Sequence, residues 1–128
     1  MRTGLDSSAV LAALLEEPGA QVVAGLLEHA VICSVNLSEV AHGLIRKGNS
    51  EVQSRALIAA LGLWVIDADA ELALDSGFLL RRTKPYGLSL GDRFCFALGR
   101  RLAAPVITAD RIWKEAARAA DVEVQLIR

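Results

Sequence analysis

Cysteine is scarce in this sequence and the net charge is close to zero, and each of these features excludes a class of protein. Only two of the 128 residues are cysteines. Cys33 and Cys95 both lie inside apolar runs, which is typical of buried free thiols in a reducing compartment and not of a disulfide framework or a zinc site. The net charge of −1 gives the chain no overall attraction to nucleic acid, so any such binding would depend on how its charges are distributed.

Long apolar runs are also missing. The longest, residues 56–66, contains Gly62 and is far shorter than the roughly 20 residues that a membrane-spanning helix needs. Asp6 stands where a secretory peptide would have its apolar segment. We therefore expect a cytoplasmic protein with no membrane association.

Apolar residues, by contrast, make up 53% of the chain, more than a soluble domain usually carries. A length of 128 residues suits one domain, and we expect residues 1–128 to form it. Part of the apolar surplus is expected to cover a partner, either a second copy or another protein. The alternative is an alanine-rich helical surface, because alanine counts as apolar.

Short apolar runs alternate with helical patterns along the chain. Strands are predicted at residues 1–5, 30–35, 63–66, 106–107 and 122–127. Helices are predicted at residues 8–15, 20–29, 37–47, 50–61, 70–83, 89–102 and 111–120. Strands that alternate with helices imply right-handed crossovers and a mostly parallel sheet covered by helices on both faces. The sequence thus predicts a three-layer α/β domain.

Four acidic residues fall at the boundaries where such a sheet forms sites, namely outside the carboxyl ends of its strands. Asp6 follows the first predicted strand and Asp110 follows the fourth. Glu39 is expected in the first turn of the helix that follows the second strand. Asp92 is expected in the first turn of the helix that begins at residue 89. A fold that brings these boundaries together would place four carboxylates in one pocket.

Each acid also has a purely structural interpretation. Asn36 and Ser89 stand three residues before Glu39 and Asp92, which is the spacing of a capping box. The other two acids could simply cap the helices that follow them. Position alone leaves both interpretations open for every one of the four.

If the four carboxylates do converge, their repulsion requires a cation. All-oxygen ligands select Mg²⁺ or Mn²⁺ over zinc, and Mg²⁺ in such a site supports hydrolytic phosphoryl chemistry. No Walker-type loop is present. Neither His29 nor His42 has a spacing that suggests a general base, which argues against a serine or cysteine nucleophile.

Basic residues are concentrated between residues 81 and 101, where Asp92 is the only acid. The bases in this stretch are Arg81, Arg82, Lys84, Arg93, Arg100 and Arg101. The first three lead into the turn at residues 85–87 and are candidates for contacting the phosphate backbone of a nucleic acid. The alternative is an ordinary solvated helical face.

Four segments together carry a resemblance to a known family. They are Leu5-Asp6-Ser7-Ser8-Ala9-Val10-Leu11-Ala12, Asn36-Leu37-Ser38-Glu39-Val40, Tyr86-Gly87-Leu88-Ser89-Leu90-Gly91-Asp92-Arg93 and Ile107-Thr108-Ala109-Asp110. In order and spacing the chain resembles PIN-domain proteins, most closely toxins of the VapC type from bacterial toxin–antitoxin pairs. The resemblance implies a five-stranded parallel sheet between helices and Mg²⁺- or Mn²⁺-dependent endonucleolytic cleavage of RNA.

The resemblance also implies a role for each matching residue. Asp6, Asp92 and Asp110 look like the main metal-binding acids, and Glu39 like an acid that assists directly or through water. Thr108 would orient the site by hydrogen bonding, the alternative being a hydroxyl that satisfies the backbone at a strand end. The family further implies a homodimer and a small antitoxin whose C-terminal segment covers the active site.

The sequence departs from the family pattern at two places. Gly4 stands in the first strand where an aliphatic residue is more common. The helix after Asp92 continues Arg93-Phe94-Cys95-Phe96, without the second acid that some relatives carry, which argues against a tightly held second metal ion.

Two hypotheses from other classes compete with a nuclease. A receiver-like phosphoacceptor domain has a similar size and plan, but it needs a pair of acids after the first strand and a lysine near the fifth. Here two serines follow Asp6. A catalytically inactive interaction module would not need the complete set of acids.

Overall fold

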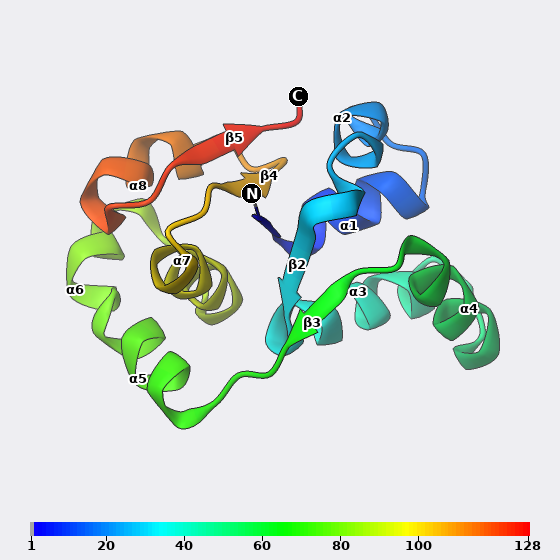
Figure 1. Ribbon diagram of the computed structural model, residues 1–128, viewed down its shortest axis with the longest axis horizontal. Helices are drawn as coiled ribbons and strands as arrows, with labels where there is room; N and C mark the ends of the chain where they lie inside the picture. The colour runs from blue at the N-terminus through cyan, green and yellow to red at the C-terminus, as the bar shows by residue number, and fades with distance from the viewer. Residues whose placement is uncertain (1) are drawn as a thin grey trace.

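A single parallel sheet of five strands runs through the middle of the protein (Figure 1). The structure is a computed structural model that describes residues 2–128, so Met1 of the first predicted strand lies outside it. The strands are β1 (Thr3–Leu5), β2 (Ala30–Cys33), β3 (Trp64–Ile66), β4 (Val106–Thr108) and β5 (Val124–Leu126). Their order across the sheet is β3-β2-β1-β4-β5, and every neighbouring pair is parallel. The predicted three-layer α/β architecture is confirmed.

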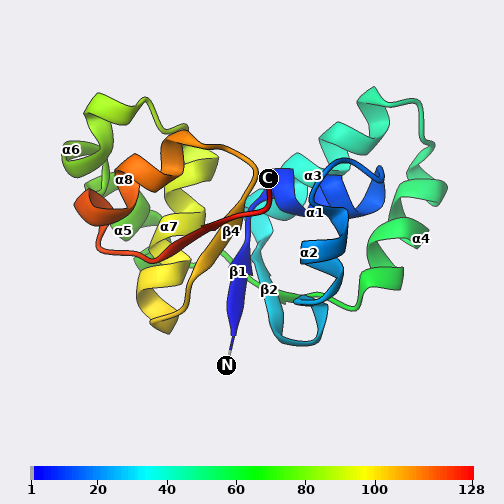
Figure 2. The same ribbon diagram turned by 90° about the horizontal axis from the view of Figure 1, so that it is seen from above.

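Helices cover both faces of this sheet, as Figure 2 shows. On one side lie α1 (Ser7–Leu14), α2 (Ala20–Ala24), α3 (Ser34–Arg46) and α4 (Glu51–Leu61). On the other lie α5 (Ala70–Phe78), α6 (Leu80–Thr83), α7 (Leu90–Leu102) and α8 (Ile112–Ala120). Short 3₁₀ helices, η1 (Leu27–His29) and η2 (Lys84–Tyr86), complete the set. Within the described residues, no helix has the length and apolarity that crossing a membrane requires.

The two faces of the sheet bury separate cores, because successive side chains of a strand point to opposite sides. In β2, Ala30 and Ile32 pack into the core on the α1 side, whereas Val31 and Cys33 pack into the core on the α7 side. Cys33 and Cys95 are buried free thiols, as expected, and burial raises the pKa of both. Neither thiol is therefore set up as a nucleophile.

Several predicted element boundaries are wrong, among them the start of the helix predicted at residues 37–47, which begins at Ser34. The helix predicted at residues 20–29 ends at Ala24, and after Gly25 the chain continues as η1. The helix predicted at residues 70–83 is divided between α5 and α6 at Leu79. The strand predicted at residues 30–35 stops at Cys33, because its apolar run continues without a turn signal into a buried helix.

The topology determines where a site can form. From the central strand β1 the chain first adds β2 and β3 on one side and then returns to add β4 and β5 on the other. Parallel sheets bind ligands at such a reversal of strand order, outside the carboxyl ends of the strands. In the flavodoxin-like order of receiver domains, β1 instead lies between β2 and β3, so the receiver hypothesis is wrong.

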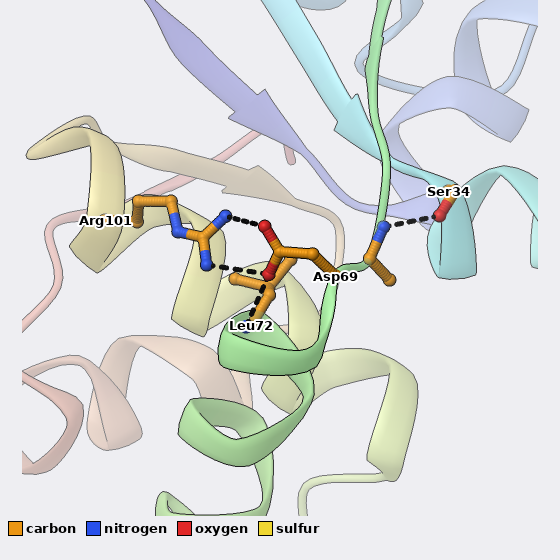
Figure 3. Close-up of polar contacts among 5 residues, drawn as sticks. Ser34, Asp69, Leu72 and Arg101 are labelled. Carbon is orange, nitrogen blue, oxygen red and sulfur yellow. Dashed lines mark hydrogen bonds and ion pairs between the residues drawn. The ribbon is translucent and has the colours of Figure 1, made fainter.

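The connection from β3 to α5 is fastened to both halves of the molecule (Figure 3). Ser34 Oγ, at the start of α3, accepts a hydrogen bond from the Ala68 amide at 2.9 Å. Asp69 accepts from the Leu72 amide at 2.8 Å and so caps α5. Both Asp69 oxygens also accept from the Arg101 guanidinium of α7, at 3.0 and 3.1 Å, which lowers the pKa of that carboxyl. Because this ion pair is exposed, it contributes more to alignment than to stability.

Two glycines test how closely α7 packs against the sheet. At Gly99 an added Cβ would lie 2.6 Å from Val106 Cγ1 of β4, whereas at Gly77 in α5 it would meet nothing within 4 Å. We expect Gly99→Ala to lower the free energy of unfolding by about 1–3 kcal/mol, as overpacking does. Gly77→Ala should raise it by roughly 0.5–1 kcal/mol through helix propensity. Urea denaturation measures both, and equal effects would contradict the close packing of α7.

Candidate functional site

Asp6 is the most deeply buried of the four predicted acids. It follows β1 and caps α1, with only 4% of its surface exposed. Its Oδ1 accepts from the Ala9 amide at 2.9 Å and from Ser8 Oγ at 2.8 Å, and its Oδ2 accepts from Thr108 Oγ1 at 2.7 Å. Burial raises the pKa of Asp6 to about 6, although these three hydrogen bonds work in the opposite direction. The carboxylate is thus firmly held and poorly solvated.

Two hydroxyl groups join the ends of β1 and β4 around this carboxylate. Thr108 is fully buried, donates to Asp6 and accepts from the Asp110 amide at 3.0 Å. Ser8 Oγ accepts from the Ala109 amide at 2.9 Å and lies 3.3 Å from Thr108 Oγ1. Thr108 thus contacts the acid and also satisfies the backbone at the end of β4. Ser8 was missed as a site residue, although a hydroxyl two residues after a strand-end acid was a usable signal.

Asp92 lies in the first turn of α7, where the capping-box interpretation is confirmed. Ser89 Oγ accepts from the Asp92 amide at 3.2 Å, and Asp92 Oδ2 accepts from the Ser89 amide at 3.0 Å. The pKa of Asp92 is raised, chiefly by burial and in addition by the negative charges of Glu39 and Asp110. Asp92 thus caps α7 and also lies among the predicted acids.

Glu39 lies in a different place on its helix from the one predicted. Since α3 begins at Ser34, Glu39 belongs to the second turn, and the capping-box interpretation of Asn36 is wrong. Asn36 is instead buried inside the helix. Its Nδ2 donates to Glu39 Oε1 at 2.9 Å and to the Gly91 carbonyl of α7 at 3.0 Å. Asn36 is a second residue that sequence analysis missed, because the boundary between β2 and α3 was misplaced.

Asp110, the last predicted acid, is exposed in the connection between β4 and α8. Its Oδ1 accepts from the Ile112 amide at 3.2 Å. Contacts of their neighbours relate the four acids to one another, because Thr108 donates to Asp6 and accepts from the Asp110 amide, while the Glu39 carboxyl group packs against Gly91 beside Asp92. The negative charges of Glu39 and Asp110 are among the causes that raise the pKa of Asp92.

The donor set of this region can be tested against a divalent cation. Within residues 2–128, no three acidic, histidine or cysteine side chains are arranged so that together they could hold a metal ion. The carboxylates are occupied by the hydrogen bonds described above. Mg²⁺ commonly takes one or two protein carboxylates and keeps several waters, whereas structural zinc requires a closed set of ligands. The donor types of this group, all of them carboxylate oxygens, are those that suit Mg²⁺ or Mn²⁺ and not zinc.

The PIN domain family matches residues 5–119 of this chain. The chain belongs to the PIN-domain family. The predicted family is thereby confirmed, and the predicted five-stranded parallel sheet is the one observed. No curated protein sequence matches the chain.

Several solved structures are similar to this PIN domain, and one of them is a member of the VapBC family of toxin–antitoxin systems. VapBC2 of Rickettsia felis, bound to a DNA fragment from its promoter, matches with a TM-score of 0.76 and 19% identity over 98% of each chain. Mycobacterium tuberculosis VapC20, a sarcin-ricin loop cleaving toxin, gives 0.72 and 17% over 89% of this chain and 94% of that one. FitAcB from Neisseria gonorrhoeae gives 0.69 and 23% over 95% of each. At these identities the comparison shows a shared fold.

The basic residues between positions 81 and 101 of this PIN domain differ in what they contact. Arg93 donates to the Ser76 carbonyl at 3.2 Å and to the Leu88 carbonyl at 3.1 Å, and so joins α7 to α5 and to the preceding loop. Arg81, Arg82 and Lys84 are exposed on α6 and η2. Among the hydrogen bonds and ion pairs of residues 2–128, none links these three to the acids. The structure therefore leaves them available for a ligand without placing them in the acidic group.

Proposed function

We propose that this PIN domain is a divalent-metal-dependent endoribonuclease that acts as the toxin of a toxin–antitoxin pair. The observation that carries the proposal is the buried Asp6 carboxylate, held by Ser8 and Thr108 across the β1–β4 reversal and coupled by charge to Asp92. Purely structural caps do not need a fully buried acid beside three others. A PIN fold with this group of acids supports metal-assisted hydrolysis of a phosphodiester.

In this proposal each residue has a distinct task. Asp6, Asp92 and Asp110 would hold Mg²⁺ or Mn²⁺, and Glu39 would assist directly or through water. When bound, the cation supplies an activated water and stabilises negative charge on the phosphate. Thr108 orients the Asp6 carboxylate by hydrogen bonding, and the Ser89 capping interaction orients Asp92. No histidine is needed as a general base in this proposal.

The proposal extends to the partners of the chain. The similar structures include VapBC and FitAB complexes, three of them bound to DNA. We propose a small antitoxin as partner, a homodimer as the assembled form, one domain over residues 1–128 and a cytoplasmic location. Apolar side chains that a partner could cover are exposed on the chain, among them Phe78 and Leu80 around the junction of α5 and α6.

Cleavage of RNA by the purified protein tests the proposed function. We expect cleavage with Mg²⁺ or Mn²⁺, none in EDTA, and suppression when the product of the adjacent gene is co-expressed. The products should carry 5′-phosphate and 3′-hydroxyl ends, because a water and not the ribose 2′-hydroxyl attacks the phosphate. Mapping of the new 5′ ends measures this. Cleavage that persists in EDTA, or 2′,3′-cyclic phosphate products, would refute the mechanism.

Contact with RNA is tested through the exposed bases of α6. We expect Arg81→Ala combined with Arg82→Ala to weaken RNA binding and to reduce the slope of log affinity against log salt by about 1–2, since single-stranded contacts contribute about 0.7 each. Binding of Mn²⁺ should not change. Arg55→Ala is the control, because Arg55 is exposed on α4 on the other side of the sheet. If the slope does not change, Arg81 and Arg82 do not contact RNA and are ordinary residues of a solvated helical face.

A further inference from the structure

The amide of Asn36 connects two helices at the acidic group. Only 1% of Asn36 is exposed, and its Nδ2 donates both to Glu39 Oε1 on α3 and to the Gly91 carbonyl on α7. Both partners are acceptors, so the amide is fixed with its nitrogen toward them. Asn36 thereby joins the assisting acid to the backbone next to Asp92.

The other end of the same amide makes no such contact. Asn36 Oδ1 is buried and finds no hydrogen-bond partner among residues 2–128. An apolar side chain of similar size would remove that unpaired oxygen, but it would leave the Gly91 carbonyl and the Glu39 carboxylate without their donor. Among residues 2–128, Thr3, Ser54, Ser76 and Trp113 also carry an unpaired buried polar atom. The inference therefore rests on the two hydrogen bonds that Asn36 Nδ2 donates and not on its oxygen.

Gly91 completes the arrangement from the opposite side. A Cβ added there would lie 2.7 Å from Glu39 Cδ and closer still to Oε2. The Glu39 carboxyl group thus packs against bare backbone in the first turn of α7, one residue before Asp92. The charge of Glu39 acts on Asp92 across this short contact.

We propose that Asn36 is a positioning residue that holds the Glu39 carboxylate against α7 beside Asp92 and so sets the affinity of the site for a divalent cation. The inference rests on the proposed function, because it assumes that these acids bind a cation. Asn36 acts through Glu39 and does not itself touch the cation. Residues that orient metal ligands by hydrogen bonding commonly contribute 10- to 100-fold to metal affinity.

The test is titration of the full chain with Mn²⁺ by calorimetry, without RNA, together with thermal denaturation in EDTA. We expect Asn36→Leu to weaken Mn²⁺ binding by about 10- to 100-fold. It should also lower the metal-free melting temperature, because the buried Gly91 carbonyl loses its donor, so binding is measured well below that temperature. Asn36→Thr keeps one hydrogen-bond donor, its hydroxyl group, and should weaken Mn²⁺ binding less than Asn36→Leu does. If the leucine variant does not fold, the threonine variant tests the role of Asn36 instead. Asn49→Leu is the control, because Asn49 donates to the Leu44 carbonyl near the end of the same helix, away from the acids.

A double-variant cycle shows whether Asn36 acts through Glu39. In a Glu39→Gln background, Asn36→Leu should cause little further loss of Mn²⁺ affinity. Full additivity of the two changes would overturn the inference, and so would Asn36 variants that bind Mn²⁺ as the wild type does. If the wild type neither binds Mn²⁺ nor cleaves RNA, the proposed function fails, and this inference fails with it. A wild type that does both, with unaltered Asn36 variants, refutes this inference alone.

Discussion

Replacing Asp6 by asparagine is expected to abolish RNA cleavage and to stabilise the metal-free protein at neutral pH. The variant keeps the shape of the side chain and loses the charge that would bind the cation. The new amide nitrogen can donate to the Thr108 hydroxyl, which now donates to Asp6 and lies 3.3 Å from Ser8 Oγ. Cleavage and stability should therefore change in opposite directions.

The stability effect depends on pH in a defined direction. The pKa of Asp6 is raised from 3.8 to about 6 in the folded protein, first of all by burial. Between these values the folded state binds more protons than the unfolded state, so the stability of the wild type falls as pH rises from about 4 to 6. Two pH units correspond to about 3 kcal/mol, which is an upper bound for the stability gained by the variant at pH 7.5.

Urea denaturation in EDTA at pH 4 and pH 7.5 measures this effect. We expect the advantage of Asp6→Asn at pH 7.5 to shrink at pH 4, where Asp6 is largely protonated. Added Mg²⁺ should stabilise the wild type and not the variant. Asp75→Asn, an exposed change on α5, is the control and should alter stability by no more than about 0.5 kcal/mol. A variant that cleaves RNA at full rate, or that is less stable than the wild type at pH 7.5, would contradict this account.

The second large effect separates the two roles of Asp92. Asp92→Asn keeps an oxygen that can accept from the Ser89 amide but loses the charge, so cleavage should fall by at least about 100-fold, the order that loss of one electrostatic stabiliser commonly costs. Ser89→Ala removes the other half of the capping box and should lower stability by about 1 kcal/mol. At a temperature well below its melting point, Ser89→Ala should retain most of its activity.

Single-turnover cleavage and thermal denaturation of both variants decide between the roles. If Asp92→Asn kept full cleavage and only lost stability, Asp92 would be a helix cap and nothing more. If Ser89→Ala lost as much cleavage as Asp92→Asn, the orientation of Asp92 would matter as much as its charge.

The positions of three acids were predictable from element boundaries in the sequence. Asp6 and Asp110 follow β1 and β4, whose carboxyl ends lie at one edge of the parallel sheet, and Asp92 lies in the first turn of the helix that begins after the turn at residues 85–87. The same periodicity predicted the alternation of strands and helices, and the four motif segments predicted the family.

The surroundings of Glu39 were less predictable. The apolar run from Ala30 to Val35 suits a buried strand and a buried first turn of helix equally well, so the start of α3 was placed too late. That error assigned Asn36 to a cap and concealed its contact with Gly91, which lies 55 residues away in the sequence. Side-chain contacts between distant segments leave no periodic signal in either segment.

Because β1 lies in the centre of the sheet, the acidic site can assemble only late in synthesis, after β4 has been made. The contact between Asp6 and Thr108 spans 102 residues, and β4, which carries Thr108, is the last strand but one to emerge from the ribosome. A nascent chain that ends before β4 already contains Asp6, Glu39 and Asp92, but it has neither the neighbouring strand of β1 on that side nor the hydroxyl that holds Asp6. Truncated translation products therefore carry most of the acids without the assembled site.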